Sequence, residues 1–195
     1  PAVRWMRCIT GGIWNRGIWP KQNQDNNMTI GVGGKTKEAA LASLSNMMAG
    51  AQPIGLDEYR QRIAGAQERM RAEGIAAIWV HAGTNLSYFT GTPWHPSERM
   101  VGAIIPATGD MEYLAPYFEQ NTLRDYMVVE GAVNVWHEHE SPYALFIATL
   151  KRMGITGNSA APTKVGISED APFFIVDGIL QLADGYRIVN AKPVT

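Results

Sequence analysis

Cysteine, excess charge of either sign and long apolar runs are all scarce in this chain of 195 residues. The single cysteine, Cys8, excludes an intramolecular disulfide, so nothing indicates an oxidising compartment. The 17 basic and 18 acidic side chains leave a net charge of −1, which disfavours a general nucleic-acid-binding or membrane-binding surface. The strongest apolar run, residues 75–80, is far shorter than the roughly 20 residues that span a bilayer. These absences predict a cytoplasmic protein with no nucleic-acid or membrane partner.

The amino-terminal 27 residues differ from the rest of the chain. They hold three of the six tryptophans and four basic residues against one acidic residue, and their apolar residues follow neither a helical nor a strand period. We expect residues 1–27 to be an irregular tail or a translated leader. The alternative is an ordered arm whose tryptophans dock on the body of the protein or on a partner. Residues 28–55 are predicted as an N-terminal helical extension, with a helix from Thr36 to Gly50, and residues 56–195 as the main domain.

The main domain alternates between helical and strand patterns. A helix with Asp57 as its N-cap carries an apolar stripe and ends at Gly74, and its opposite face is interpreted as a solvated charged surface. The apolar run at residues 75–80 follows directly and predicts a strand buried on both faces. Other strands are predicted at residues 100–105, 111–115, 133–137, 164–168 and 186–189, and other helices after Ser141 and Pro172. The predicted fold class is α/β, with a single mixed sheet of about six strands flanked by helices.

The His-Glu-His-Glu stretch at residues 137–140 looks like a metal cluster. On a strand, His137 and His139 would share one face, as two zinc ligands do. No third and fourth His or Cys lies nearby in the sequence to complete such a site. The pattern therefore favours a polar strand end that leads into a helix capped by Ser141, and no metal ligand is predicted.

Two consecutive loops are the most informative part of the sequence. Residues 84–91 (Thr-Asn-Leu-Ser-Tyr-Phe-Thr-Gly) are interpreted as a polar loop that leads into a short aromatic-bearing turn. Residues 92–99 (Thr-Pro-Trp-His-Pro-Ser-Glu-Arg) are too rich in Trp, His and Arg for a simple connector. Loops that follow a buried strand are where α/β proteins place ligand contacts. The alternative is a surface loop with an Arg ion pair and a Trp packed on the core.

The order and spacing of these stretches resemble the amino-terminal domain of the creatinase / prolidase / aminopeptidase P family, the "pita-bread" metallopeptidases, over about residues 56–195. A helix of Tyr-Arg-x-Arg-Ile type comes first at residues 59–63, and residues 84–91 are similar to the family's Asn-Ile-x-Tyr-Leu-Thr-Gly signature. Later matches are Glu98-Arg99 before a strand, Pro116-x-Phe-Glu119 after the predicted hairpin, and residues 136–143 at the start of a helix. The resemblance implies the creatinase/prolidase N-terminal fold, with its ribonuclease H-like motif.

The resemblance also implies that the chemistry belongs to a second, carboxy-terminal domain. In that domain of the family, two Asp, one His and two Glu hold a pair of divalent ions, manganese, cobalt or zinc. The aspartates of this chain do not have the eleven-residue spacing of those ligands. We therefore expect a fragment of a longer enzyme that has no catalytic or metal-binding residue of its own, with the catalytic domain missing after Thr195.

In relatives, the amino-terminal domain dimerises and lends residues to the active site of its neighbour. By this resemblance, Arg99 offers its guanidinium to the carboxylate of a peptide or small amide substrate, while Trp94 and His95 wall the pocket. Ser97 stands where creatinase has an aromatic residue, so the sequence departs from the family pattern there. The resemblance thus implies a homodimer with a site completed in trans.

Three functions remain open from the sequence. The leading one is the non-catalytic amino-terminal domain of an Xaa-Pro dipeptidase or aminopeptidase, which contributes dimerisation and substrate-pocket residues. The second is the corresponding domain of a creatinase-like amidinohydrolase, which the mismatch at Ser97 mildly disfavours. The third is a stand-alone peptide-binding module.

Overall fold

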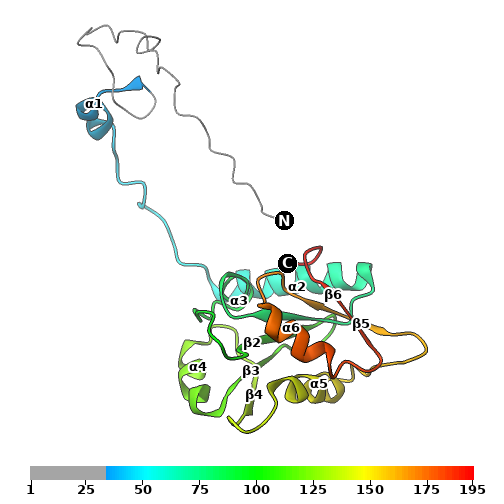
Figure 1. The fold of residues 1–195 in the computed structure, drawn as a ribbon. Helices are drawn as coiled ribbons and strands as arrows, with labels where there is room; N and C mark the ends of the chain where they lie inside the picture. Colours follow the sequence, from blue (N-terminus) through cyan, green and yellow to red (C-terminus); the bar gives the residue numbers. More distant parts are fainter. Residues whose placement is uncertain (1–33) are drawn as a thin grey trace, which may run out of the picture. The chain divides into compact units, whose positions relative to one another are not determined.

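The computed structural model describes residues 34–195, and both interpretations of residues 1–27 lie outside the described residues. The chain divides into two units, with the boundary between Ala51 and Gln52 (Figure 1). The boundary predicted between residues 55 and 56 stays a prediction.

A short helix, α1 (Lys37–Ala42), lies in the first unit. The Ala39 N–H donates a hydrogen bond of 3.1 Å to the Thr36 Oγ1, so the helix begins where the sequence predicts. It ends at Ala42, however, and the predicted extension to Gly50 is wrong. The large apolar side chains expected on its buried face are all exposed: Leu41, Leu44, Met47 and Met48. Without packing of an apolar face, helices shorter than about 12 residues are marginal in water, so nothing extends this one.

The second unit begins with α2 (Leu56–Glu73). Its N-cap is Gly55, and the predicted cap at Asp57 is wrong. Asp57 instead lies in the first turn, where a carboxylate interacts favourably with the helix dipole, and it pairs with Arg60 at 3.3 Å. The predicted apolar stripe is confirmed, since Ala66 and Met70 are fully buried, and burial of a side chain such as Met70 contributes about 1.5–3 kcal/mol. Gly74, at φ 65°, ends the helix as predicted.

Six strands form one mixed sheet in the order β4-β3-β2-β1-β5-β6. The strands are β1 (Ala77–His81), β2 (Gly102–Pro106), β3 (Glu112–Pro116), β4 (Ala132–Trp136), β5 (Thr163–Ile167) and β6 (Tyr186–Asn190). β2 pairs antiparallel with both β1 and β3, whereas the pairs β1–β5, β5–β6 and β3–β4 are parallel. Within the described residues, β2 alone therefore runs against the other strands, which all end at the same edge of the sheet.

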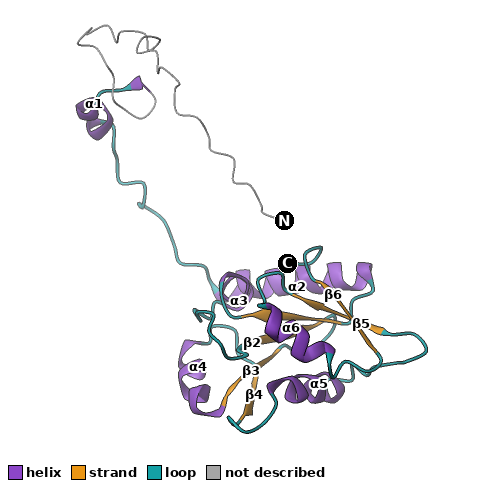
Figure 2. Cartoon of the chain, viewed as in Figure 1, coloured by secondary structure: helices purple, strands orange, loops and turns teal. Residues whose placement is uncertain are grey.

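Helices cover both faces of the sheet (Figure 2). The side chains of β1 alternate between two buried apolar clusters: Ile78 and Val80 join the cluster beneath α2, and Trp79 joins the cluster beneath the later helices. The remaining helices are α3 (Thr84–Thr90), the 3₁₀ turn η2 (Tyr117–Glu119), α4 (Gln120–Tyr126), α5 (Pro142–Arg152) and α6 (Phe173–Leu180). Figure 1 shows α2 along one side of the sheet and α5 along the other. The predicted α/β class, with one mixed six-stranded sheet and flanking helices, is confirmed.

Local signals account for several of these elements. The Ala144 N–H donates to the Ser141 Oγ at 3.2 Å, and Pro142 occupies the first helical turn of α5, as predicted. Residues 84–90 form a full helix, α3, where the sequence suggested a polar loop and a turn. The helix predicted after Pro172 is confirmed as α6, and its first residue, Phe173, is 78% exposed. None of the described helices combines the length and apolar composition needed to cross a membrane.

Candidate functional site

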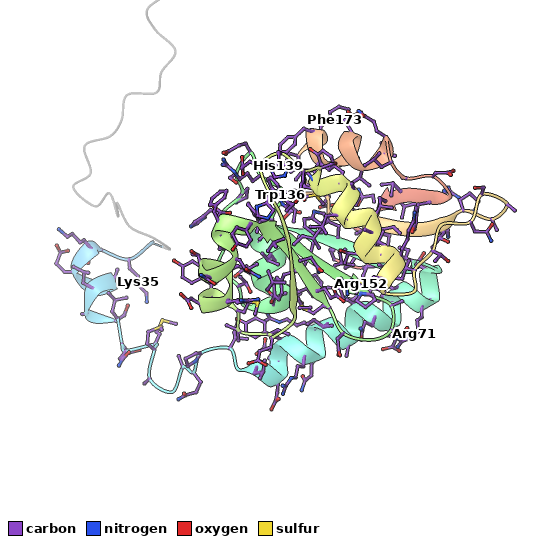
Figure 3. All side chains as sticks on the ribbon, turned by 90° about the horizontal axis from the view of Figure 1, so that it is seen from below. Lys35, Arg71, Trp136, His139, Arg152 and Phe173 are labelled. Carbon is purple, nitrogen blue, oxygen red and sulfur yellow. The ribbon has the colours of Figure 1, made fainter. Side chains whose placement is uncertain are left out.

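The carboxyl ends of the parallel strands gather the loops that the sequence singles out. Residues 82–83 follow β1, residues 92–101 precede β2, residues 117–119 follow β3, residues 137–141 follow β4 and residues 168–172 follow β5. Figure 3 shows Trp136, His139 and Phe173 at this end of the sheet, with Arg152 and Arg71 toward the opposite end. In open α/β sheets, ligands bind at the carboxyl ends of the strands.

A hollow of about 620 Å³ opens at this edge, and we call it the edge hollow. The start of α2, the first turns of α3, the 92–99 loop and the loop after β5 supply its lining. Its lining residues are Ile54, Tyr59, Arg62, Gly83, Thr84, Ser87, Tyr88, Pro93, Trp94, His95, Pro96 and Asp170. Its volume and its largely aromatic and apolar lining are those of a small-molecule site.

Two glycines allow the chain to close around the edge hollow. A Cβ on Gly83 would lie 3.3 Å from Pro96 Cγ, so the absence of a side chain lets Pro96 pack there. Gly91 ends α3 at φ 73°, a left-handed conformation that favours glycine. A Cβ on Gly91 would lie 2.8 Å from Val128 Cβ and 2.9 Å from Tyr59 Cε2, closer than real atoms approach. The sequence Thr-Gly at residues 90–91 thus fixes where the 92–99 loop begins.

The structure brings Trp94 and His95 together in the edge hollow. Trp94 is half-buried against the apolar cluster beneath α2, and its ring meets the ring of Tyr126 edge-on at 6.0 Å. His95 is exposed beside it. One residue of the pair is therefore anchored by packing, and the other is free to meet a ligand.

Arg99, the third candidate, does not line the edge hollow. Its Nε donates a hydrogen bond of 3.1 Å to Glu138 Oε1, its Nη1 pairs with Glu98, and its guanidinium lies 5.2 Å from the centre of the Phe118 ring. The hydrogen bond to Glu138 raises the pKa of Arg99, so the guanidinium keeps its charge at any physiological pH. Two carboxylates, those of Glu98 and Glu138, therefore already pair with Arg99. A substrate carboxylate would have to displace one of them to bind Arg99.

Glu119 lies close to this ion-pair cluster and carries an unpaired acceptor. Its Oε2 is buried without a hydrogen-bond partner. Burial raises the pKa of this carboxyl, and the charge of Arg99 acts in the opposite direction. The neighbourhood of Arg99 thus holds three carboxyl groups for one guanidinium.

Arg62 lies on the face of α2 that the sequence predicts to be a solvated charged surface, and for this residue the prediction is wrong. Its Nη1 donates to the Tyr88 carbonyl oxygen at 2.8 Å, and its Nη2 pairs with Glu58. The guanidinium lies 4.3 Å from the centre of the Tyr88 ring and 5.3 Å from that of Tyr59. Arg62 therefore holds one wall of the edge hollow together, through a contact between residues 26 positions apart.

His81 and Asp170 also lie at this edge of the sheet, and the sequence did not predict either of them as a candidate site residue. His81, the last residue of β1, is fully buried, and neither of its ring nitrogens has a hydrogen-bond partner. Burial lowers its pKa, with the charge of Asp170 acting in the opposite direction. Asp170 is exposed and makes no hydrogen bond or ion pair through its carboxylate with residues 34–195. The signal that could have found Asp170 is its position, three residues after a parallel strand.

The histidine pair after β4 forms a surface stack. The His137 ring lies 4.6 Å from the Tyr117 ring and 5.7 Å from the His139 ring, centre to centre. β4 ends at Trp136, one residue before the predicted end, so both histidines lie after the strand and not on one of its faces. Across residues 34–195, no group of three or more His, Cys, Asp or Glu side chains is arranged to hold a metal ion.

Comparison with known proteins identifies the family. Residues 62–195 match the model of the Creatinase/Prolidase N-terminal domain. The chain belongs to this family. The resemblance noted in the sequence is confirmed over most of its predicted extent. Among curated proteins, none matches the chain.

Solved structures share the fold of this Creatinase/Prolidase N-terminal domain. The dipeptidase PepE from Mycobacterium ulcerans has 22% identity and a TM-score of 0.62 over 73% of this chain, and a prolidase from Thermococcus sibiricus has 24% identity and 0.59 over 74%. The matched region is only 37% and 36% of those two chains. The Creatinase/Prolidase N-terminal domain of an X-Pro dipeptidase from Streptococcus pyogenes has 15% identity and 0.53 over 68% of this chain, and the match covers 95% of that domain. This chain therefore spans about a third of the length of the longer relatives and nearly all of the isolated domain.

Proposed function

We propose that this chain is the non-catalytic amino-terminal lobe of an Xaa-Pro dipeptidase or aminopeptidase. The observation that carries the proposal is the coverage: the chain matches nearly all of an isolated N-terminal domain and about a third of PepE and of the prolidase. In this proposal a carboxy-terminal domain holds a pair of manganese, cobalt or zinc ions, which activate the water that attacks the peptide bond. The division into residues 1–27, 28–55 and 56–195, and the cytoplasmic location, are part of the same proposal.

The lobe contributes side chains to a substrate pocket completed across a homodimer. Trp94 and His95 support this role because they lie together on the rim of the edge hollow, at the carboxyl ends of the strands. Trp94 supplies a packed aromatic wall that excludes water, and His95 supplies an exposed hydrogen-bonding ring. Both come from one loop, so they act as a unit toward a peptide or a small amide.

In this proposal Arg99 binds the substrate carboxylate, which must first displace one of the acidic partners of Arg99. Glu98 and Glu138 hold the guanidinium when substrate is absent, and the ring of Phe118 supports it. A substrate carboxylate replaces one of these acids by forming a bidentate pair. Because Glu98 and Glu138 are both more than half exposed, either acid regains water when it is displaced.

Substitution of Arg99 in a polypeptide that also carries the catalytic domain tests this role. A charged hydrogen bond contributes about 1.5–3 kcal/mol, so we expect Arg99→Ala to raise KM by roughly ten- to a hundredfold. Arg124→Ala is the matched control, because Arg124 is an exposed arginine of α4. Unchanged KM and kcat in Arg99→Ala would refute the role.

A stand-alone peptide-binding module is the second candidate. This candidate is favoured because every lining residue of the edge hollow lies within residues 54–170, so a second domain is not needed to form the hollow. The two candidates differ in the part of the gene downstream of this domain: metal-ligating carboxylates and a histidine encoded there indicate the peptidase, and their absence from the gene indicates the binding module. The creatinase-like amidinohydrolase would share the peptidase's downstream ligands and differ in substrate.

A further inference from the structure

The charges that line the edge hollow do not balance. Arg62 and Asp170 are its charged lining residues, apart from the titratable His95. Glu58 already pairs with Arg62, and the Tyr88 carbonyl accepts one of its N–H groups. Asp170 has no such partner within residues 34–195. The hollow therefore presents one uncompensated negative charge at its rim.

The buried histidine nearby does not cancel this charge. Burial lowers the pKa of His81, and the opposing attraction of Asp170 leaves that direction unchanged, so the imidazole is neutral at pH 7.

We propose that the edge hollow binds a small organic cation, a protonated amine on an apolar body. Asp170 pairs with the ammonium group, and the apolar body packs against Trp94, Tyr88 and the ring of Pro96. The inference rests on the proposed function for the use of the hollow as a substrate pocket, and it adds the charge of the group that enters it. Neutral and anionic molecules of the same shape lose the pair with Asp170 and bind more weakly.

Three probes with one apolar body and different charges test this selectivity. The full 195-residue chain is titrated with 2-phenylethylamine, 2-phenylethanol and phenylacetate at pH 7.5, with binding followed by calorimetry and by the indole N–H resonance of Trp94. We expect the amine to bind best and phenylacetate worst. An exposed ion pair contributes up to about 1 kcal/mol, so Asp170→Asn should weaken the amine roughly fivefold and leave the alcohol unchanged. Asp125→Asn, an exposed acid of α4, is the matched control and should change neither.

A measurement without substitution checks the same pair. Raising the salt from 0.15 M to 1 M should weaken binding of the amine to the wild-type chain and leave that of the alcohol nearly unchanged, because salt screens exposed charges. Equal affinities for the three probes, an Asp170→Asn variant that binds the amine as the wild type does, or no detectable binding of the amine would each overturn the inference. None of these results bears on whether the chain is the lobe of a peptidase, which is tested by turnover and by the Arg99 variant.

Discussion

The edge hollow and the Arg99 cluster are built by the two halves of one short loop, yet their chemistry is opposite. Residues 93–96 line an aromatic hollow whose one uncompensated charge is Asp170. Residues 98–99 belong to an ion-pair cluster in which the single guanidinium meets Glu98 and Glu138, with Glu119 nearby. A loop that looks in sequence like one substrate-binding stretch is thus divided into an apolar half that is open and a charged half that is already paired.

The two halves of the loop should therefore respond to different substitutions. The hollow depends on backbone geometry and packing, because glycines and aromatic rings shape it. The Arg99 cluster depends on exposed charges, which contribute little to stability but can be exchanged for a ligand's charge. Substitutions at the glycines should therefore act on folding, and substitutions in the cluster on binding.

Gly91 gives the largest expected effect. A Cβ there clashes with Val128 and Tyr59 and must adopt φ 73°, so we expect Gly91→Ala to lower the free energy of unfolding by about 2–4 kcal/mol. Gly154→Ala is the control, since Gly154 also has positive φ (79°) but nothing within 4 Å of its Cβ position, and about 1 kcal/mol is expected for its backbone strain alone. Urea denaturation measures both, and equal losses would show that the close approach at Gly91 is unimportant.

The pH dependence of stability tests His81 beneath the hollow. The pKa of His81 is lower in the folded chain than in the unfolded chain, where it is near 6.5. As the pH falls through 6.5, the unfolded chain therefore binds a proton at His81 before the folded chain does. The free energy of unfolding therefore falls as the pH drops below 6.5, by up to about 1.4 kcal/mol per pH unit, and His81 causes no such loss above pH 6.5. We expect His81→Leu to remove that slope below pH 6.5, because both ring nitrogens lack partners whose loss would cost energy.

The surface histidine His139 supplies the control for that series. It is exposed in the stack after β4, so His139→Leu should retain the wild-type slope. A slope that survives in His81→Leu would assign the acid sensitivity to another group.

The smallest expected effect concerns the charge balance around Arg99. Glu138→Gln removes the carboxylate that accepts a hydrogen bond from the Arg99 Nε–H. A substrate carboxylate then competes with one acid fewer for the guanidinium. In a polypeptide that carries the catalytic domain, KM should fall by up to about fivefold, the size of an exposed ion pair. Glu130→Gln is the control, because Glu130 is exposed and precedes β4, whereas Glu138 follows it at the other end of the strand. A rise in KM would show that Glu138 positions Arg99 for substrate instead of competing for it.

The sheet was predicted well from the sequence, because its buried strands are short apolar runs that can be recognised there. The run at residues 75–80 is apolar throughout, and its residues 77–80 lie in β1, in which every residue is buried. Ser141-Pro142 and Gly74 acted through local backbone chemistry and were interpreted correctly. The extension of α1 to Gly50 failed because the periodic apolar residues of this stretch are exposed, and the pattern alone cannot reveal whether an apolar face is buried.

The site was predicted only in part, because its chemistry depends on contacts between distant positions. Trp94 and His95, which composition and the resemblance singled out, line the edge hollow, and their role toward a substrate stays a prediction. The pairing of Arg99 with Glu138 joins residues 39 positions apart, and the packing of Arg62 on Tyr88 joins helices that no local period connects. Asp170 and His81 are 89 positions apart along the chain, and the pairing of β5 with β1 brings them near enough for the charge of Asp170 to act on the pKa of His81.

Hydrolysis of an Xaa-Pro dipeptide by the 195-residue chain alone, with manganese supplied, tests most directly that this domain is not itself catalytic. We expect no turnover above that of a heat-denatured sample, because residues 34–195 offer no cluster for a metal ion. Turnover that a chelator abolishes and manganese restores would place the catalytic centre within this chain and refute its non-catalytic role.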